Sequence, residues 1–204
     1  MELIILLIAL ALNAVGDVFL LRGARETNYE SGLAALEKTS DKDIRFGALL
    51  GLLVIPPWAL ILPHLSDIPG TAGPIAIFAW ATYVAAVFAF HMSYAFVGPA
   101  IKLAPELKKP FGKLVMTIAL YSLLAATVVS LALAWAGATG TLTMTWYHYA
   151  TLPMLIILFF QAVLGRIFRR IPYFPIICGP MAMAVFFIAF YDMMRLNSGV
   201  FGVG

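Results

Sequence analysis

Charged residues are scarce in this chain. They account for 11% of its 204 residues, whereas soluble domains carry roughly 25%. Hydrophobic residues account for 63% of the chain. So few charges do not supply the polar surface of a water-soluble domain, and the composition therefore indicates a protein that is embedded in a membrane.

Several sequence signatures of disulfides, metal sites and catalytic nucleophiles are also missing. The single cysteine, Cys178, excludes a disulfide within the chain. The three histidines do not occur in a zinc-binding spacing such as HExxH, and no serine lies in a nucleophile elbow. We therefore expect no bound metal and no cofactor. Only Glu2 precedes the first apolar run, where a signal peptide would carry basic residues, so we expect that run to remain as a helix.

What the chain does contain is a series of long apolar runs. About 20 apolar residues are enough for one helix to cross a membrane. The runs are Leu3–Leu21, Phe46–Pro63, Pro74–Val97, Leu114–Gly137, Trp146–Gly165 and Pro172–Tyr191. They predict an all-α fold, a polytopic integral membrane helix bundle of six transmembrane helices that forms a single domain over residues 1–204.

The positions of the charges predict how this bundle is oriented in the cell membrane. The basic residues gather in loops 22–45, 98–113 and 166–171, and Arg195 in the tail is the one basic residue elsewhere. Because cytoplasmic loops are rich in lysine and arginine, we expect these three loops in the cytoplasm and both termini outside. The net charge of +3 is then a topology signal, and it predicts no nucleic-acid partner.

One carboxylate interrupts the first apolar run, in the stretch NAVGDVFLLRG. Asp17 precedes Arg22 by one and a half turns, which places it about 7–8 Å inside the cytoplasmic boundary. Asn13 lies one turn deeper on the same helix face. An ionisable group in the membrane costs about 2.5–3.5 kcal/mol and usually marks function. The structural alternative is an ion pair with Arg22 or Arg166, or a side chain that reaches the nearby interface.

Further polar residues fall at the same depth. One face of the third run carries Trp80, Tyr83, His91 and Tyr94. The inner ends of the fourth and fifth runs carry Tyr121 and Gln161. Because a carboxylate can orient an imidazole and raise its basicity, we predict that Asp17 contacts His91 directly or through one water. A second polar set, His64, Asp67, His148 and Asp192, falls at the outer helix ends, where we expect Asp192 to pair with Arg195.

The stretches GDVFLLRG, RFGALLGLL and HMSYAFVG, with His64 between the last two, resemble a domain-of-unknown-function family of small, mainly bacterial multi-pass membrane proteins. This resemblance covers roughly the first half of the chain. It implies the fold class and marks Asp17 and His91, and it implies no activity.

A weaker similarity is to the membrane lysoplasmalogenases, which carry a Gly-Asp in a helix, a His-x-x-Tyr and a late aspartate. That similarity implies one site built from Asp17, His91, Tyr94 and Asp192. The chain differs from these enzymes in helix count and in the 74-residue separation of Asp17 from His91.

Three functions remain open at this point. The first is an enzyme that acts on a lipid or isoprenoid-like substrate, with His91 as acid–base, Asp17 to orient or charge it, and Tyr94 to assist. Substrate binding would then fall to Asn13, Trp80, Tyr83, Tyr121 and Gln161. The second is a transporter or channel for a small molecule or proton, and the third is a non-catalytic scaffold. A cavity open to lipid favours the enzyme, a passage between both faces favours transport, and a filled bundle favours the scaffold.

Overall fold

A computed structural model of the chain describes residues 1–26, 28 and 32–198, and every regular element among them is a helix. Five helical stretches are long and apolar enough to cross a membrane. They are α1 (Glu2–Leu20), Asp41–Ser66, α5 (Ala72–Leu103), Pro105–Ala138 and α10 (Phe174–Asn197). The predicted all-α membrane bundle is therefore confirmed as a fold class.

Two of these stretches contain more than one element. The first consists of α3 (Asp41–Val54), the 3-10 helix η2 (Pro56–Ile61) and α4 (Leu62–Ser66). The second consists of η3 (Pro105–Leu107) and α6 (Lys108–Ala138). The side chain of Ser40 starts α3 by accepting a hydrogen bond from the Asp43 N–H at 3.1 Å. The helix gives way to η2 at Pro56, because a proline ring has no N–H to donate to the preceding turn.

The fifth apolar run does not form one continuous helix. It is divided into α7 (Trp146–Ala150), α8 (Pro153–Leu158), the π-helix η4 (Phe159–Leu164) and α9 (Gly165–Ile167). Leu152 is extended, with ψ 144°, because the proline that follows disfavours the helical conformation at the preceding residue. Within the fifth run, the continuous apolar helical part is Pro153–Ile167, which is shorter than each of the five spanning stretches.

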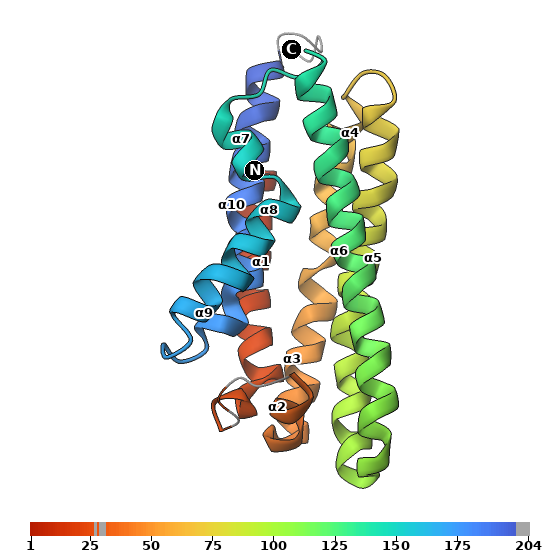
Figure 1. Cartoon of the computed structure of the whole chain (residues 1–204), viewed down its shortest axis with the longest axis vertical. Helices are drawn as coiled ribbons and strands as arrows, with labels where there is room; N and C mark the ends of the chain where they lie inside the picture. The colour runs from red at the N-terminus through yellow and green to blue at the C-terminus, as the bar shows by residue number, and fades with distance from the viewer. Residues whose placement is uncertain (27, 29–31, 199–204) are drawn as a thin grey trace.

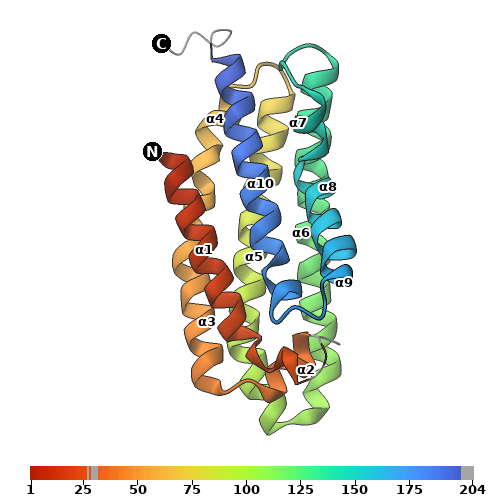
Figure 2. The ribbon, with the colours of Figure 1, turned by 90° about the vertical axis from the view of Figure 1, so that its left-hand side faces the viewer.

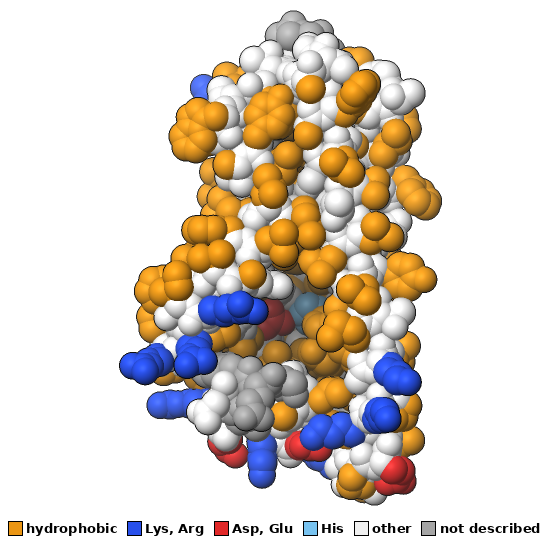
Figure 3. Space-filling view, viewed as in Figure 1, with side chains coloured by type: hydrophobic (Ala, Val, Ile, Leu, Met, Phe, Trp, Pro, Cys, Tyr) orange, Lys and Arg blue, Asp and Glu red, His pale blue; other side chains and the backbone are white. Residues whose placement is uncertain are grey.

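When the broken segment α7–α9 is counted, the helical stretches run alternately up and down the bundle (Figures 1 and 2). The 3-10 helix η1 (Arg22–Arg25), the short helix α2 (Gly32–Lys38) and the α5–α6 and α9–α10 connections lie toward one end. The α4–α5 and α6–α7 connections lie at the other end. On the face shown in Figure 3, hydrophobic side chains cover the middle of the molecule and basic side chains gather toward its lower end. The loops that are rich in lysine and arginine thus share one end of the bundle.

Close helix packing positions the residues discussed below. A Cβ at Gly47 of α3 would lie 2.5 Å from the Gly16 carbonyl oxygen of α1, so only glycine permits this approach. In the half of the bundle away from the basic loops, the rings of Trp80, Phe186 and Phe187 pack together in the buried core. The polar side chains of the candidate site described below lie in the half of the bundle that holds the basic loops.

Candidate functional site

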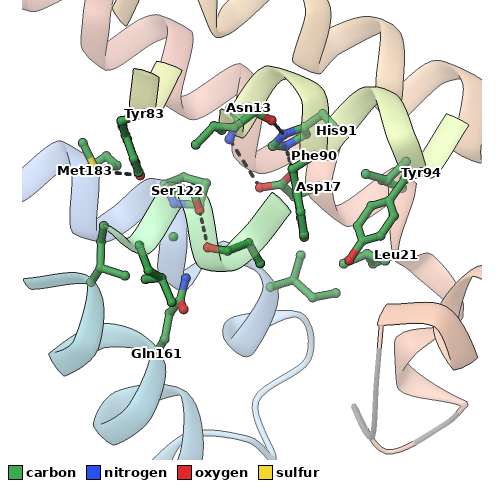
Figure 4. Close-up of a pocket in the computed structure, with 18 of the residues that line it drawn as sticks. Asn13, Asp17, Leu21, Tyr83, Phe90, His91, Tyr94, Ser122, Gln161 and Met183 are labelled. Carbon is green, nitrogen blue, oxygen red and sulfur yellow. Dashed lines mark hydrogen bonds and ion pairs between the residues drawn. The ribbon is translucent and has the colours of Figure 1, made fainter. Parts of the chain in front are cut away.

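The buried contact predicted between the first and third apolar runs is present. Nε2 of His91 on α5 lies 2.8 Å from Oδ1 of Asp17 on α1, and the two side chains are 8% and 14% exposed. Nδ2 of Asn13, one turn before Asp17, donates to the other carboxylate oxygen, Oδ2, at 3.3 Å. Figure 4 shows the three side chains converging on one point. Neither Arg22 nor Arg166 pairs with Asp17 among the described ion pairs, and Arg22 pairs with Asp43 instead.

The hydrogen bonds of His91 fix how protons are distributed over the pair. Nδ1 of His91 lies 2.9 Å from the carbonyl oxygen of Val87. A carbonyl oxygen only accepts, so Nδ1 carries a hydrogen. The contact between Nε2 and Oδ1 of Asp17 is then attractive only if a second proton lies between these two atoms. Neither ring nitrogen offers a free lone pair, and the free acceptor of the pair is the Asp17 carboxylate.

This pair lines a cavity of about 250 Å³. The cavity is enclosed by side chains from α1, η2, α5, α6, α8, η4 and α10. Its apolar wall includes Leu20, Val87, Leu123, Ile157 and Met183. The cavity lining is mostly apolar with few polar groups, an arrangement typical of ligand sites.

The cavity reaches the side of the bundle. In Figure 3 an acidic and a histidine side chain are visible at the bottom of a hollow in the lateral face. Hydrophobic side chains border the hollow above and to one side, and basic side chains border it where α9 lies in Figure 1. The pair is therefore reached through a lateral hollow whose border is apolar on two sides and basic on a third.

The structure brings most of the predicted site residues to this cavity, and two of them lie elsewhere. Asn13, Tyr83 and Gln161 line it together with the Asp17–His91 pair.

Trp80 instead lies in the core, where its indole N–H donates to the Trp58 carbonyl at 2.8 Å. Tyr121 is 62% exposed on the outside of α6. The face of α6 that lines the cavity carries Ala119, Ser122 and Leu123, so Ser122 takes the place predicted for Tyr121.

Tyr94 lines the cavity in a different way from the one predicted. Its ring is buried, and a Cβ at Gly32 of α2 would lie 2.6 Å from its hydroxyl oxygen. Figure 4 shows this hydroxyl beside Leu21, with no hydrogen bond drawn to Asp17. Tyr94 therefore lines the cavity without a hydrogen bond to either member of the pair.

Trp58 is a cavity residue that the sequence reasoning did not predict. Trp58 follows the Pro56–Pro57 pair in η2 and lines the cavity. Within the described part of the chain, its indole nitrogen and Oδ1 of Asn13 are buried polar atoms without a hydrogen-bond partner. Gln161 was predicted, but not the π-helix that carries it. Such π-turns are frequent at functional sites.

The second polar set lies at the opposite end of the bundle. Asp192 accepts hydrogen bonds from the Tyr147 hydroxyl and from His148, whose Nε2 lies at 3.2 Å. The expected ion pair with Arg195 is wrong, because Asp192 faces α7 and finds its partners there. Nε2 of His64 lies 2.7 Å from the Glu2 carboxylate. Asp192 lines neither the cavity nor any part of the Asp17 site.

Within residues 1–26, 28 and 32–198, no group of three or more histidine, cysteine or acidic side chains is placed to hold a metal ion. Compared with protein-family models, curated proteins and solved structures, the chain matches none of them. The resemblances seen in the sequence motifs therefore stay predictions, and the site has to be interpreted from its own geometry.

Proposed function

We propose that this protein is a membrane-embedded enzyme that acts by acid–base chemistry on a lipid or isoprenoid-like substrate. The observation that carries the proposal is the proton-sharing Asp17–His91 pair at a largely apolar cavity that reaches the side of the bundle. Ionisable groups inside a membrane are costly and usually functional. Membrane lipids are accordingly the partners that this site selects.

The size of the cavity limits how a substrate is bound. A volume of about 250 Å³ is smaller than the roughly 300–1,000 Å³ of pockets that enclose drug-sized ligands. A lipid therefore inserts only the part that reacts, while the rest of its apolar body stays in the bilayer. The lateral opening makes this arrangement possible, and Gln161 and Ser122 lie on the cavity wall to hydrogen bond the inserted part.

The proton positions assign the roles within the pair. Both ring nitrogens of His91 are engaged, so Oδ2 of Asp17 accepts the proton from substrate or from an attacking water. The proton already shared with Oδ1 then moves onto Nε2, and the imidazole carries the resulting charge. This reverses the order expected from the sequence, in which His91 itself contacted the reacting group.

The transport alternative has less support. A proton or solute path would have to continue from the cavity to the end of the bundle that holds Asp192. In the described chain that region is filled by the buried rings of Trp80, Phe186, Phe187 and Phe190. A scaffold, in turn, would not need to retain an internal carboxylate beside a cavity.

The experiment that tests the proposal compares membrane lipids in cells with and without the protein, by mass spectrometry that resolves individual lipid species. We expect one lipid class to fall and a chemically related one to rise when the protein is present. Unchanged lipids, together with uptake of a solute or protons into vesicles that contain the purified protein, would favour transport and contradict the enzyme.

The orientation that fits this site has six crossings, with the basic loops in the cytoplasm and both termini outside. The broken segment α7–α9 serves as the fifth crossing, since it descends from the α6–α7 connection toward the basic end beside α10 (Figure 2). Breaks of this kind are tolerated at membrane depth where they line a cavity, as η4 does through Gln161.

Cysteine labelling tests this orientation. In a chain whose buried Cys178 is replaced by alanine, cysteines at Lys42, Glu106 and Arg169 should react only from the cytoplasm. Cysteines at Thr71 and Thr139 should react only from outside. All five positions are exposed. Labelling of positions 139 and 169 from the same side would show that α7–α9 does not cross, and the six-helix topology would fail.

A further inference from the structure

Three arginines form a basic segment beside the cavity. Arg166, Arg169 and Arg170 are exposed, and none of them makes an ion pair within the described part of the chain. The sequence contains no acidic residue between Glu106 and Asp192. The positive charge of this segment is therefore not balanced locally.

Other basic residues at the same end are partly neutralised. Nζ of Lys102 lies 2.6 Å from Asp41, and Nζ of Lys108 lies 2.9 Å from Glu37. Loop 22–45 carries as many acidic as basic residues. The orientation of the protein in the membrane would explain why all three loops are basic. It does not explain why, of the three, only the loop beside the cavity opening has no basic residue paired with an acidic one among the described ion pairs.

The arginines lie between η4 and α10, and both of these helices carry residues that line the cavity. Gln161 lies on the cavity wall and is exposed, and it belongs to the π-helix η4, which α9 continues. Arg166 lies in α9, five residues and little more than one helical turn beyond Gln161. Arg169 and Arg170 lead into α10, whose Ile176 is also a lining residue. Figure 3 shows basic side chains bordering the hollow in this region.

We propose that Arg166, Arg169 and Arg170 bind the anionic phosphate head group of the lipid that enters this cavity. The inference rests on the proposed function and names the substrate class. Guanidinium groups match phosphate oxygens in geometry and charge, and the apolar opening receives the adjoining chain. Asp17 lies about 7–8 Å farther into the membrane than the boundary, so the reacting bond lies near the head-group end of the lipid.

A binding experiment tests this without turnover. Delipidated protein is placed in nanodiscs of phosphatidylcholine that contain equal minor amounts of phosphatidylglycerol and diacylglycerol with identical chains. The lipids that stay bound are counted by native mass spectrometry. We expect phosphatidylglycerol to be retained at least about tenfold over diacylglycerol, because each basic residue near an anionic lipid adds to its attraction.

The variants R166Q, R169Q and R170Q, combined, should bring the two lipids to about equal retention. The matched control combines K42Q, R45Q and K109Q, which remove the same charge from exposed residues at the same end. These lie ten or more residues along the chain from any lining residue, and the control should keep the preference. If the combined variant folds poorly, R166Q alone should weaken the preference several-fold. Both faces of a nanodisc are accessible, so altered orientation in cells does not affect the result.

Equal retention of both lipids by the unchanged protein would overturn the inference, as would an equal loss of preference in the control. This outcome is separable from the proposed function. An arginine-dependent preference supports the head-group site even if membrane lipids prove unaltered in cells. If the arginine variant still converts lipid and the unchanged protein shows no lipid preference, the proposed enzyme is supported and the proposed head-group site is contradicted.

Discussion

Replacing Asp17 by asparagine, or His91 by glutamine, should each reduce formation of the lipid product by about 10²–10⁴-fold, the usual contribution of general acid–base catalysis. D17N removes the oxygen that accepts the proton, and H91Q removes the ring that holds the shared proton 2.8 Å away. Because the two residues act as one unit, the double variant should be no less active than either single variant. The measurement is the same lipid-resolved mass spectrometry, made at matched protein levels.

The stability of these variants has to be measured beside their activity. Leaving one member of a buried pair without its partner typically costs about 3–5 kcal/mol. D17N avoids much of this cost, because an amide can donate to Nε2 while Nδ1 of His91 keeps its bond to Val87. We expect D17N to remain folded, with a thermal unfolding temperature close to that of the unchanged protein.

The matched control is D192N. It removes a carboxylate that is also bonded to a histidine, 3.2 Å away, at the other end of the bundle, and activity should stay within a few-fold. A loss in D192N as large as that in D17N would place both aspartates in one site, as the lysoplasmalogenase-like motif implies. Losses that multiply in the double variant would show that Asp17 and His91 act independently.

The Asp17–His91 contact could be predicted because depth is readable from the sequence. Apolar runs and basic loops set the height of each residue, and Asp17 and His91 fall at one height in the first and third runs. The height of a residue does not determine how its helix is rotated about its own axis. In a membrane the lipid-facing and core-facing sides are equally apolar, so hydrophobicity does not reveal which side of α6 faces inward.

The misplacement of Tyr121 follows from this. Tyr121 and Ser122 have nearly the same height, but only Ser122 lines the cavity while Tyr121 faces outward. Trp80 shares a face with Tyr83, yet it packs on Phe186 and Phe187 and lies beyond the cavity. The π-helix around Gln161 and the position of Trp58 at the cavity depend on tertiary packing, which no local sequence pattern specifies.

One glycine of the stretch GALLG packs directly against the pair and can control the position of its imidazole. Gly51 of α3 faces the ring of His91: a Cβ at this position would lie 2.9 Å from Cδ2 and 3.1 Å from Cβ of His91. No side chain fits there unless the imidazole moves. The ring is bonded to Asp17 and Val87 on either side, so it has little freedom to move while keeping both hydrogen bonds.

Replacing Gly51 by alanine should therefore lower activity by about 10²-fold, the effect of displacing a catalytic group by roughly 1 Å. Overpacking should also lower the free energy of unfolding by about 1–3 kcal/mol. Product formation and thermal unfolding are measured on the same preparations. We expect G51A to insert and fold, because the strained contact is with a side chain and not with backbone, unlike the contacts of Gly47.

G98A provides the matched control, because Gly98 of α5 packs against α3, the same two helices that meet at Gly51. A Cβ there would lie 2.6 Å from the end of the Ile44 side chain, so the variant carries a similar packing strain without touching His91. It should be destabilised to a comparable degree and keep its activity within a few-fold. If G98A loses as much activity as G51A, the loss reports general packing. If folded G51A is fully active, the position of the His91 ring does not matter for the reaction, and the catalytic role of the pair is contradicted.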